Sequence, residues 1–360
     1  MKRIWTLHGW LGLVFAIPFV LLSVTGAILV RYDWVERVFD RAVFRSSGAP
    51  APAALTTLVA RFAKPRPEVR IRYIEWPAAP GRNPVIFVHG SGTRRAFILD
   101  ATSGTVLAER DELQGPRRWL LHLHATFWAG AVGELIVAVS SLALVLVALS
   151  GLWVYRGAWA GLFRPRFRRV LGNRVASGDL HRWTGIASLL LLLTLGFTGA
   201  LLTVPGVPRL FSGPRPEPAL GEPYDWSKAP PVEPMLQMIR ERLPGVDADF
   251  VALPEGPNGS FTWYTIRREA WLWHKYAEVE FSGTTGTLVE IRRAADQGPL
   301  ERVNALVAIF HFGHQGGELM RWVYFLGGFG PLVLAVTGTF VWWSRGRRSP
   351  TSRPPDVIRR

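Results

Sequence analysis

The chain has 360 residues, of which 49% are hydrophobic, and a formal net charge of +15 at pH 7. Together with a positive mean hydropathy, this composition is typical of a membrane protein with sizeable polar domains rather than of a soluble enzyme. The chain has no cysteine, which excludes disulfides, iron–sulfur clusters, Cys-based zinc sites and covalently attached c-type haem.

Four apolar stretches are long enough to cross a bilayer, whose core is about 30 Å thick and needs about 20 apolar residues per helix. They lie at about 10–31, 132–155, 184–204 and 322–343. The first follows "MKR", but its apolar run is too long for a signal peptide and no A-x-A cleavage site follows it. We therefore expect an α-helical membrane protein with four transmembrane helices, the first within residues 1–31.

The orientation follows from arginine-rich segments. Arginines cluster in the connection 156–183 and in the tail 344–360, and the N-terminus is basic as well. By the positive-inside rule these segments are cytoplasmic, so both termini lie inside and the long segments 32–131 and 205–321 lie outside. We expect a multi-pass protein of a bacterial inner membrane. Because the basic clusters are short and juxtamembrane, they predict contact with lipid and no nucleic-acid partner.

The two external segments share one pattern. The first begins with the amphipathic "AALTTLVARFAK" and continues with the strand-like "VRIRYIEWP", "PVIFVHG" and "RRAFILD". The second, after a Pro-rich linker, begins with "EPMLQMIRERLPG" and continues with "DFVALPE", "FTWYTIR" and "AEVEF". Each ends in a strand, an "SGT" turn and another strand. The pattern predicts two α+β domains of the same kind, at 32–131 and 205–321.

The outgoing membrane helices are repeats of each other. "LHGWLGLVFAIPFVLLSVTGAIL" at 7–29 returns as "LHRWTGIASLLLLLTLGFTGALL" at 180–202. Identical residues stand 173 positions apart: Leu7/Leu180, His8/His181, Trp10/Trp183, Gly12/Gly185, Thr25/Thr198, Gly26/Gly199 and Ala27/Ala200. Both units begin inside, so the four helices form a tandem parallel repeat.

The returning helices repeat as well, at an offset of 187. "LHLHATFWAG" precedes the second span and "IFHFGHQGG" the fourth. The offset aligns these residues: His124/His311, Gly130/Gly317, Ala148/Ala335, Ser150/Thr337 and Gly151/Gly338. Two pairs result, His8 with His181 at the inner end of the bundle and His124 with His311 at the outer end.

Two neutral imidazoles facing each other across a pseudo-twofold axis are the axial ligands of a six-coordinate haem b. The alternative is an interfacial anchor, a histidine beside tryptophan at the headgroup level. A zinc or copper site needs three or four converging ligands, and each end offers two. We therefore predict two haem b groups, with the small Gly and Thr residues leaving room for the macrocycle.

The remaining histidines are weaker candidates. His122 and His314, also at the outer end, are surface residues, partners of the ligands or substituted ligands. His89 and His274 lie in the external domains without matched partners.

The sequence resembles the PepSY-associated transmembrane family, which includes bacterial inner-membrane siderophore reductases. The resemblance rests on "LHGWLG…TGAIL", "LHRWTG…TGALL", "LHATFWAG", "FHFGHQGG", "VTGTFVWW" and "LDATSGTVL". It implies haem b bound by transmembrane histidines, here His8, His181, His124 and His311, and electron transfer to a ferric chelate in the periplasm that frees Fe(II). Some relatives continue into a flavodoxin-reductase-like domain. Here the cytoplasmic segments have no G-x-G-x-x-G motif, so we expect a separate donor, a quinol or a flavin reductase.

The leading interpretation is thus a transmembrane ferric-siderophore reductase that works by outer-sphere transfer and needs no acid–base residues. External arginines attract an anionic chelate in this interpretation, and aromatic residues stack on it, although a solvated face and a domain core account for both sets more simply. The two sets are Arg66, Arg70, Arg72, Arg94, Arg95, Arg117 and Arg118, and Trp263, Trp271, Trp273 and Tyr276. The alternative is a non-redox membrane protein whose external domains bind or regulate a periplasmic partner, as a protease inhibitor or a sensor accessory.

Overall fold

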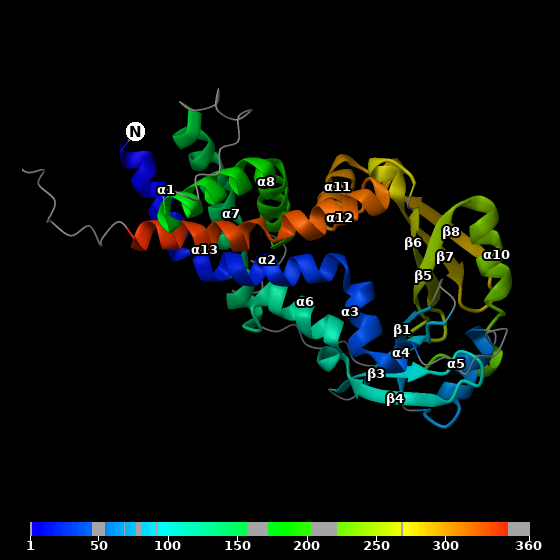
Figure 1. Ribbon diagram of the computed structural model, residues 1–360. Coiled ribbons are helices and arrows are strands. Elements are labelled where there is room, and N and C mark those ends of the chain that lie inside the picture. Colours follow the sequence, from blue (N-terminus) through cyan, green and yellow to red (C-terminus); the bar gives the residue numbers. More distant parts are fainter. Residues whose placement is uncertain are drawn as a thin grey trace, which may run out of the picture.

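The computed structural model describes residues 2–44, 55–67, 69–76, 81–90, 93–156, 172–203, 222–267 and 269–344. A bundle of helices lies at one end of the molecule and an antiparallel sheet at the other, joined by shorter helices (Figure 1). Most of the expected basic tail, and residues 157–171 of the expected basic loop, lie outside the described residues.

Three helices of the described chain are long and apolar enough to cross a membrane, or four spans if a bent pair is counted as one. The three are α7 (Gly130–Tyr155), α8 (Asn173–Thr203) and the combined α12 (Gly317–Gly328) and α13 (Gly330–Trp343). The bent pair is α1 (Lys2–Val14) and α2 (Ala16–Val30). These helices cover the four stretches expected from hydropathy.

The first span differs from its repeat because it is broken. The axes of α1 and α2 enclose a bend of 61°. Pro18 has no N–H to donate to the carbonyl of Val14, and its ring crowds the preceding turn. In the second repeat Leu191 occupies the matching position, and α8 continues without interruption.

Small residues let these helices pack closely. An ideal Cβ on Gly196 of α8 would lie 2.9 Å from a side-chain carbon of α7. Similarly, a Cβ on Gly330 would lie 3.1 Å from Ser188 of α8, and one on Gly328 would lie 3.2 Å from Ala27 of α2. Such close approaches are the usual basis of helix association in membranes. They place α8 against both α7 and α13, and α2 against the junction of α12 and α13.

Four shorter helices connect the bundle to the sheet (Figure 1). They are α3 (Tyr32–Phe39) and α4 (Arg41–Phe44) after α2, α6 (Pro116–Thr126) before α7, and α11 (Pro299–His311) before α12. Both α6 and α11 begin with proline, whose fixed φ and missing N–H suit the first helical position. Each of these two helices begins on the side of the sheet and carries a histidine at or near its other end, His124 in α6 and His311 in α11.

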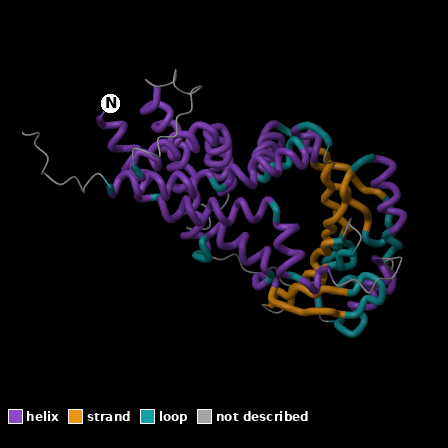
Figure 2. The backbone as a smooth tube through the Cα atoms, in the orientation of Figure 1, coloured by secondary structure: helices purple, strands orange, loops and turns teal. Residues whose placement is uncertain are grey.

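One eight-stranded sheet contains the strands of both external segments (Figure 2). The strands are β1 (Arg70–Glu75), β2 (Val85–Gly90), β3 (Thr93–Leu99), β4 (Val106–Asp111), β5 (Val246–Ala252), β6 (Ser260–Arg267), β7 (Tyr276–Ser282) and β8 (Leu288–Arg293). Their order is β4-β3-β2-β1-β5-β6-β7-β8, antiparallel throughout. The halves meet where β1 pairs with β5, from Tyr73 opposite Ala252 to Glu75 opposite Phe250.

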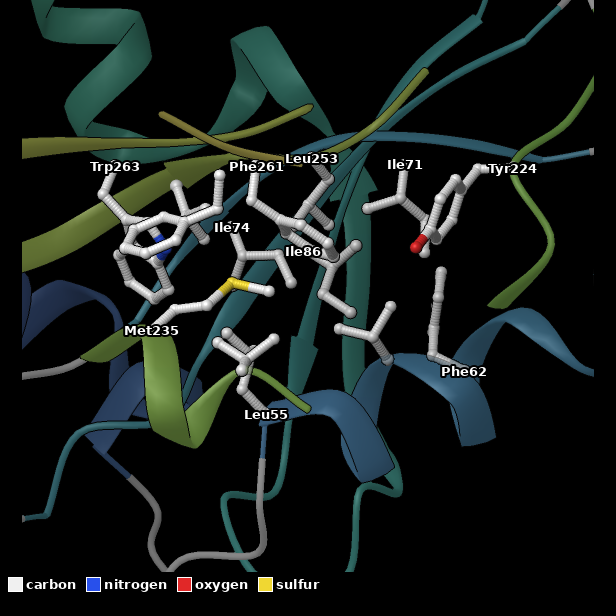
Figure 3. Close-up of a cluster of buried hydrophobic side chains, with 14 of the residues drawn as sticks. Leu55, Phe62, Ile71, Ile74, Ile86, Tyr224, Met235, Leu253, Phe261 and Trp263 are labelled. Atoms are coloured by element: carbon white, nitrogen blue, oxygen red, sulfur yellow. The ribbon is translucent and has the colours of Figure 1, made fainter. Parts of the chain in front are cut away.

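The larger of two hydrophobic clusters in the described residues lies between this sheet and the helices α5 (Leu55–Ala63) and α10 (Glu233–Arg242) (Figure 3), and the smaller one packs Val43 of α4 against β2 and β3. Ile74 and Ile86 of the first half and Val251, Phe261 and Trp263 of the second are all almost completely buried in it. The two units expected from the sequence therefore share a sheet and a core. Pairing β1 with β5 satisfies two strand edges that would otherwise be open.

Short 3-10 turns follow or precede these elements: η1 (Glu112–Gln114), η5 (Trp226–Lys228), η6 (Leu272–Lys275) and η7 (Ala294–Asp296).

Candidate functional site

Two pairs of histidines face each other in the bundle. His8 of α1 and His181 of α8 form the inner pair, with ring centroids 6.2 Å apart and ring planes at 89°. His124 of α6 and His311, the last residue of α11, form the outer pair, with ring centroids 6.3 Å apart and planes at 53°. The structure thus brings together the residues that the two sequence offsets pair.

Each of the four imidazoles is held by a hydroxyl on another helix of its own repeat. The Nδ1 atom lies 3.0 Å from Ser150 Oγ for His8, 2.9 Å from Thr25 Oγ1 for His124, 3.0 Å from Thr337 Oγ1 for His181 and 3.0 Å from Thr198 Oγ1 for His311. The same hydrogen bond is therefore made four times.

These hydrogen bonds fix the tautomer of the rings. A hydroxyl has one proton to donate, and Thr25, Thr198 and Thr337 each donate theirs to the backbone carbonyl four residues earlier, at 2.6 Å. Each oxygen must then accept from the imidazole, so Nδ1 carries the proton. For His8 the carbonyl of Val147, 3.1 Å from Nδ1, requires the same, since a carbonyl only accepts. In the neutral ring Nε2 then keeps its lone pair, as in a metal-ligating histidine.

A glycine beside each hydroxyl makes room for the ring. Ideal Cβ atoms on Gly26, Gly338, Gly151 and Gly199 would lie 2.9, 3.0, 3.1 and 3.3 Å from the Cε1 atoms of His124, His181, His8 and His311. The sequence interpretation assigned these glycines to clearance for a macrocycle. In the structure they lie against the histidines themselves.

The two pairs occupy opposite ends of the bundle. His181 stands near the start of α8, and Gly199, which contacts His311, stands near its end. At 1.5 Å per residue the helix rises about 27 Å between them. A hydrocarbon core is about 30 Å thick, so one pair lies near each face of a bilayer that the bundle spans.

The four other histidines join neither pair. His122 stacks on Trp128, with centroids 5.2 Å apart, and His314 Nδ1 lies 2.6 Å from the hydroxyl of Tyr276. His89 lies in the sheet, where Nε2 is 3.4 Å from Glu112; burial, followed by the charge of Arg72, lowers its pKa. His274 lies in η6 beside Trp273.

Among the arginines expected to attract an anion, several are engaged by carboxylates. Their ion pairs are Arg72–Glu255 at 3.7 Å, Arg95–Glu109 at 2.8 Å, Arg117–Glu75 at 3.6 Å and Arg118–Glu112 at 3.4 Å. In the aromatic set Trp263 is completely buried in the core, so it cannot stack on a ligand, whereas Trp271 is 71% exposed.

A polar cavity that sequence reasoning missed lies between the sheet and the helices α3 and α6. Its lining includes Glu36, Glu75, Glu112, Arg110 and Arg118. Burial raises the pKa of the Glu36 carboxyl despite the Arg82 guanidinium 3.2 Å away. These charges satisfy one another across α3, α6 and the sheet, and thereby anchor the first half of the sheet to the helices.

No group of three or more His, Cys, Asp or Glu side chains suited to a metal ion occurs within the described residues. The candidate site is therefore two separate pairs of neutral imidazoles, each able to supply two nitrogen ligands.

These features define a membrane protein with helical spans, paired histidines and a sheet-rich region. The chain belongs to the PepSY-associated TM region family, whose model matches residues 5–345. It is 27% identical over 257 residues to an uncharacterized protein of Pseudomonas aeruginosa, and the match covers 65% of this chain and 65% of that protein.

Proposed function

We propose that the protein is a di-haem b electron carrier of a bacterial inner membrane that reduces ferric siderophores or other ferric chelates in the periplasm and releases Fe(II). One observation carries the proposal: two facing histidine pairs, each with Nδ1 protonated and Nε2 free, lie at opposite ends of a membrane-spanning bundle.

The ring spacing fits a metal ion held between two axial imidazoles. With metal–nitrogen distances of about 2.0–2.1 Å, and each ring centre a little more than 1 Å beyond its nitrogen, two axial rings have centroids roughly 6.3 Å apart. The observed separations are 6.2 and 6.3 Å. Because each place offers two protein ligands, the other equatorial positions have to come from a cofactor, and a porphyrin supplies four. With no cysteine in the chain, the haem is of the non-covalent b type.

The chain's own residues would bind the two haems and orient the imidazole rings that hold them. His8 and His181 would hold one haem and His124 and His311 the other, while Ser150, Thr337, Thr25 and Thr198 keep each ring in the tautomer that leaves Nε2 free. Bound haem supplies one-electron chemistry between Fe(III) and Fe(II). Two sites about 27 Å apart along α8 divide into steps an electron transfer across the membrane that is too long for a single haem.

The orientation and partners complete the proposal. The arginine-rich segments favour a cytoplasmic location for both termini, and in this orientation the sheet and the outer pair face the periplasm. A separate quinol or flavin reductase supplies electrons at the inner pair. The acceptor is a ferric chelate. Its reduction releases the iron, because Fe(II) binds hard oxygen ligands far less tightly than Fe(III) does.

The rival proposal is a non-redox protein whose sheet binds or regulates a periplasmic partner. It accounts for the sheet but gives no role to four imidazoles that share the same tautomer and the same contacts.

The absorption spectrum of protein purified from haem-replete cells separates the two proposals. We expect a Soret band, split low-spin α and β bands after dithionite, and extractable haem b. Stopped-flow mixing of the reduced protein with a ferric siderophore should then reoxidise it. In His311→Ala the reoxidation should be lost, and in His8→Ala the remaining outer haem should still reoxidise. Colourless protein would refute the redox function, and equal reoxidation rates in both variants would refute the direction of transfer.

A further inference from the structure

The hydroxyl and glycine that hold each histidine do more than fill space. We propose that the four Ser/Thr–Gly pairs Thr25-Gly26, Ser150-Gly151, Thr198-Gly199 and Thr337-Gly338 are positioning residues. They fix the planes of the axial imidazoles and thereby give the inner and outer haems different electronic properties. The inference rests on the proposed function, since it concerns haems held by these histidines.

Two contacts determine each ring plane. The Nδ1–H donates to the hydroxyl, and Cε1 rests over the adjacent glycine, where no Cβ stands in the way. Turning a ring about its Cβ–Cγ bond would break the hydrogen bond or drive Cε1 into the helix backbone. A hydroxyl followed by a glycine is thus a notch that accepts an imidazole in one orientation.

The notches leave the two pairs at different angles. The inner rings are nearly perpendicular, at 89°, and the outer rings lie at 53°. Each axial imidazole raises the energy of the iron dπ orbital that overlaps its π system. Perpendicular rings act on different dπ orbitals and keep them nearly degenerate, which gives oxidised low-spin haem a large maximum g value. Rings closer to parallel act on the same orbital, split the pair and lower that value.

The hydroxyls act on the potential as well. An Nδ1–H that donates to an oxygen makes the imidazole a stronger electron donor through Nε2. A stronger donor favours Fe(III), so loss of the hydroxyl should raise the midpoint potential of the haem concerned.

Helix structure alone does not account for these hydroxyls. Thr194 of α8 makes the same type of bond to the carbonyl four residues earlier, at 2.9 Å, and is only half-buried. Thr198 makes that bond at 2.6 Å and contacts His311 besides. Thr194→Val is therefore a matched control for Thr198→Val, since both replacements remove one hydroxyl from the same helix.

The experiment is electron paramagnetic resonance of the oxidised full-length protein, with a redox titration of each haem. Wild type should show two low-spin signals, and the one with the larger maximum g value should disappear in His8→Ala. Thr198→Val should move only the outer signal and raise the outer midpoint potential, Thr198→Ser should restore both, and Thr194→Val should change neither. Gly338→Ala, whose added Cβ would lie 3.0 Å from Cε1 of His181, should lower the maximum g value of the inner signal and leave the outer signal unchanged.

Two failures are distinguishable. Protein without a Soret band refutes the proposed function and this inference with it. Protein with two haems whose signals coincide, or whose signals and potentials are unmoved by Thr198→Val and Gly338→Ala, overturns the inference and leaves the proposed function standing.

Discussion

The outer histidine pair allows a quantitative test of which residues build the site. His311 lies 6.3 Å from His124, centroid to centroid. Each six-coordinate iron needs two axial ligands. His311→Ala should therefore reduce the haem content from about two to about one per chain, because one of the two sites keeps one ligand only.

The measurement is a pyridine haemochromogen assay on purified protein of known concentration. His314→Ala is the matched control, since this neighbouring imidazole bonds to Tyr276 and should leave about two haems per chain. His122→Ala is the equivalent control for His124→Ala, and His8→Ala or His181→Ala should each remove the inner haem. If His314→Ala or His122→Ala caused the larger loss, the outer pair identified by the offset of 187 would be wrong.

Two further predictions concern the sheet. Trp263 is completely buried in the core shared by both halves, so Trp263→Ala should lower the free energy of unfolding by about 3–5 kcal/mol and speed amide exchange in β2 and β7 together. Trp271→Ala, at a 71% exposed residue, should leave both quantities nearly unchanged. Faster exchange confined to β7 would contradict a shared core. Burial lowers the pKa of His89 from its ordinary 6.5. The unfolded chain therefore binds more protons than the folded state as the pH falls below about 6.5, and the free energy of unfolding should decrease there. Thermal unfolding across this range should show a smaller loss for His89→Gln than for wild type, and an unchanged slope would refute the argument.

The pairing of the histidines could be read from the sequence because the repeat is parallel. Equivalent residues of two parallel units meet across one axis, so the offsets of 173 and 187 select His181 for His8 and His311 for His124. The break in the first span follows from Pro18, but its 61° bend depends on how α1 packs against α7 and α13, which no local pattern encodes.

The contacts of the Ser/Thr–Gly pairs with the histidines, and the joining of the two halves into one sheet, could not be predicted from local sequence patterns for a different reason. Glycine and threonine near the end of a membrane helix suit close helix packing as well as they suit an imidazole. The distinguishing signal was the recurrence of a hydroxyl residue followed by glycine on all four spans, as in Thr25-Gly26 and Ser150-Gly151. Likewise, alternation and "SGT" turns locate strands, but the pairing of β1 with β5 joins residues 175 to 179 positions apart, from Glu75 and Phe250 to Tyr73 and Ala252. Sequence periodicity carries no information on such a contact.

The duplication has a structural logic that connects these features. Each repeat holds its own histidines: His8 docks on Ser150 and His124 on Thr25 in the first, His181 on Thr337 and His311 on Thr198 in the second. A single repeat therefore presents two half-sites, each with one oriented ring. Complete sites arise only where the repeats meet, and the helix contacts between Gly328 and Ala27 hold them together within the bundle. The pairing of β1 with β5 does the same outside it. The joined sheet is therefore a second connection between the two repeats, outside the bundle in which their histidines meet.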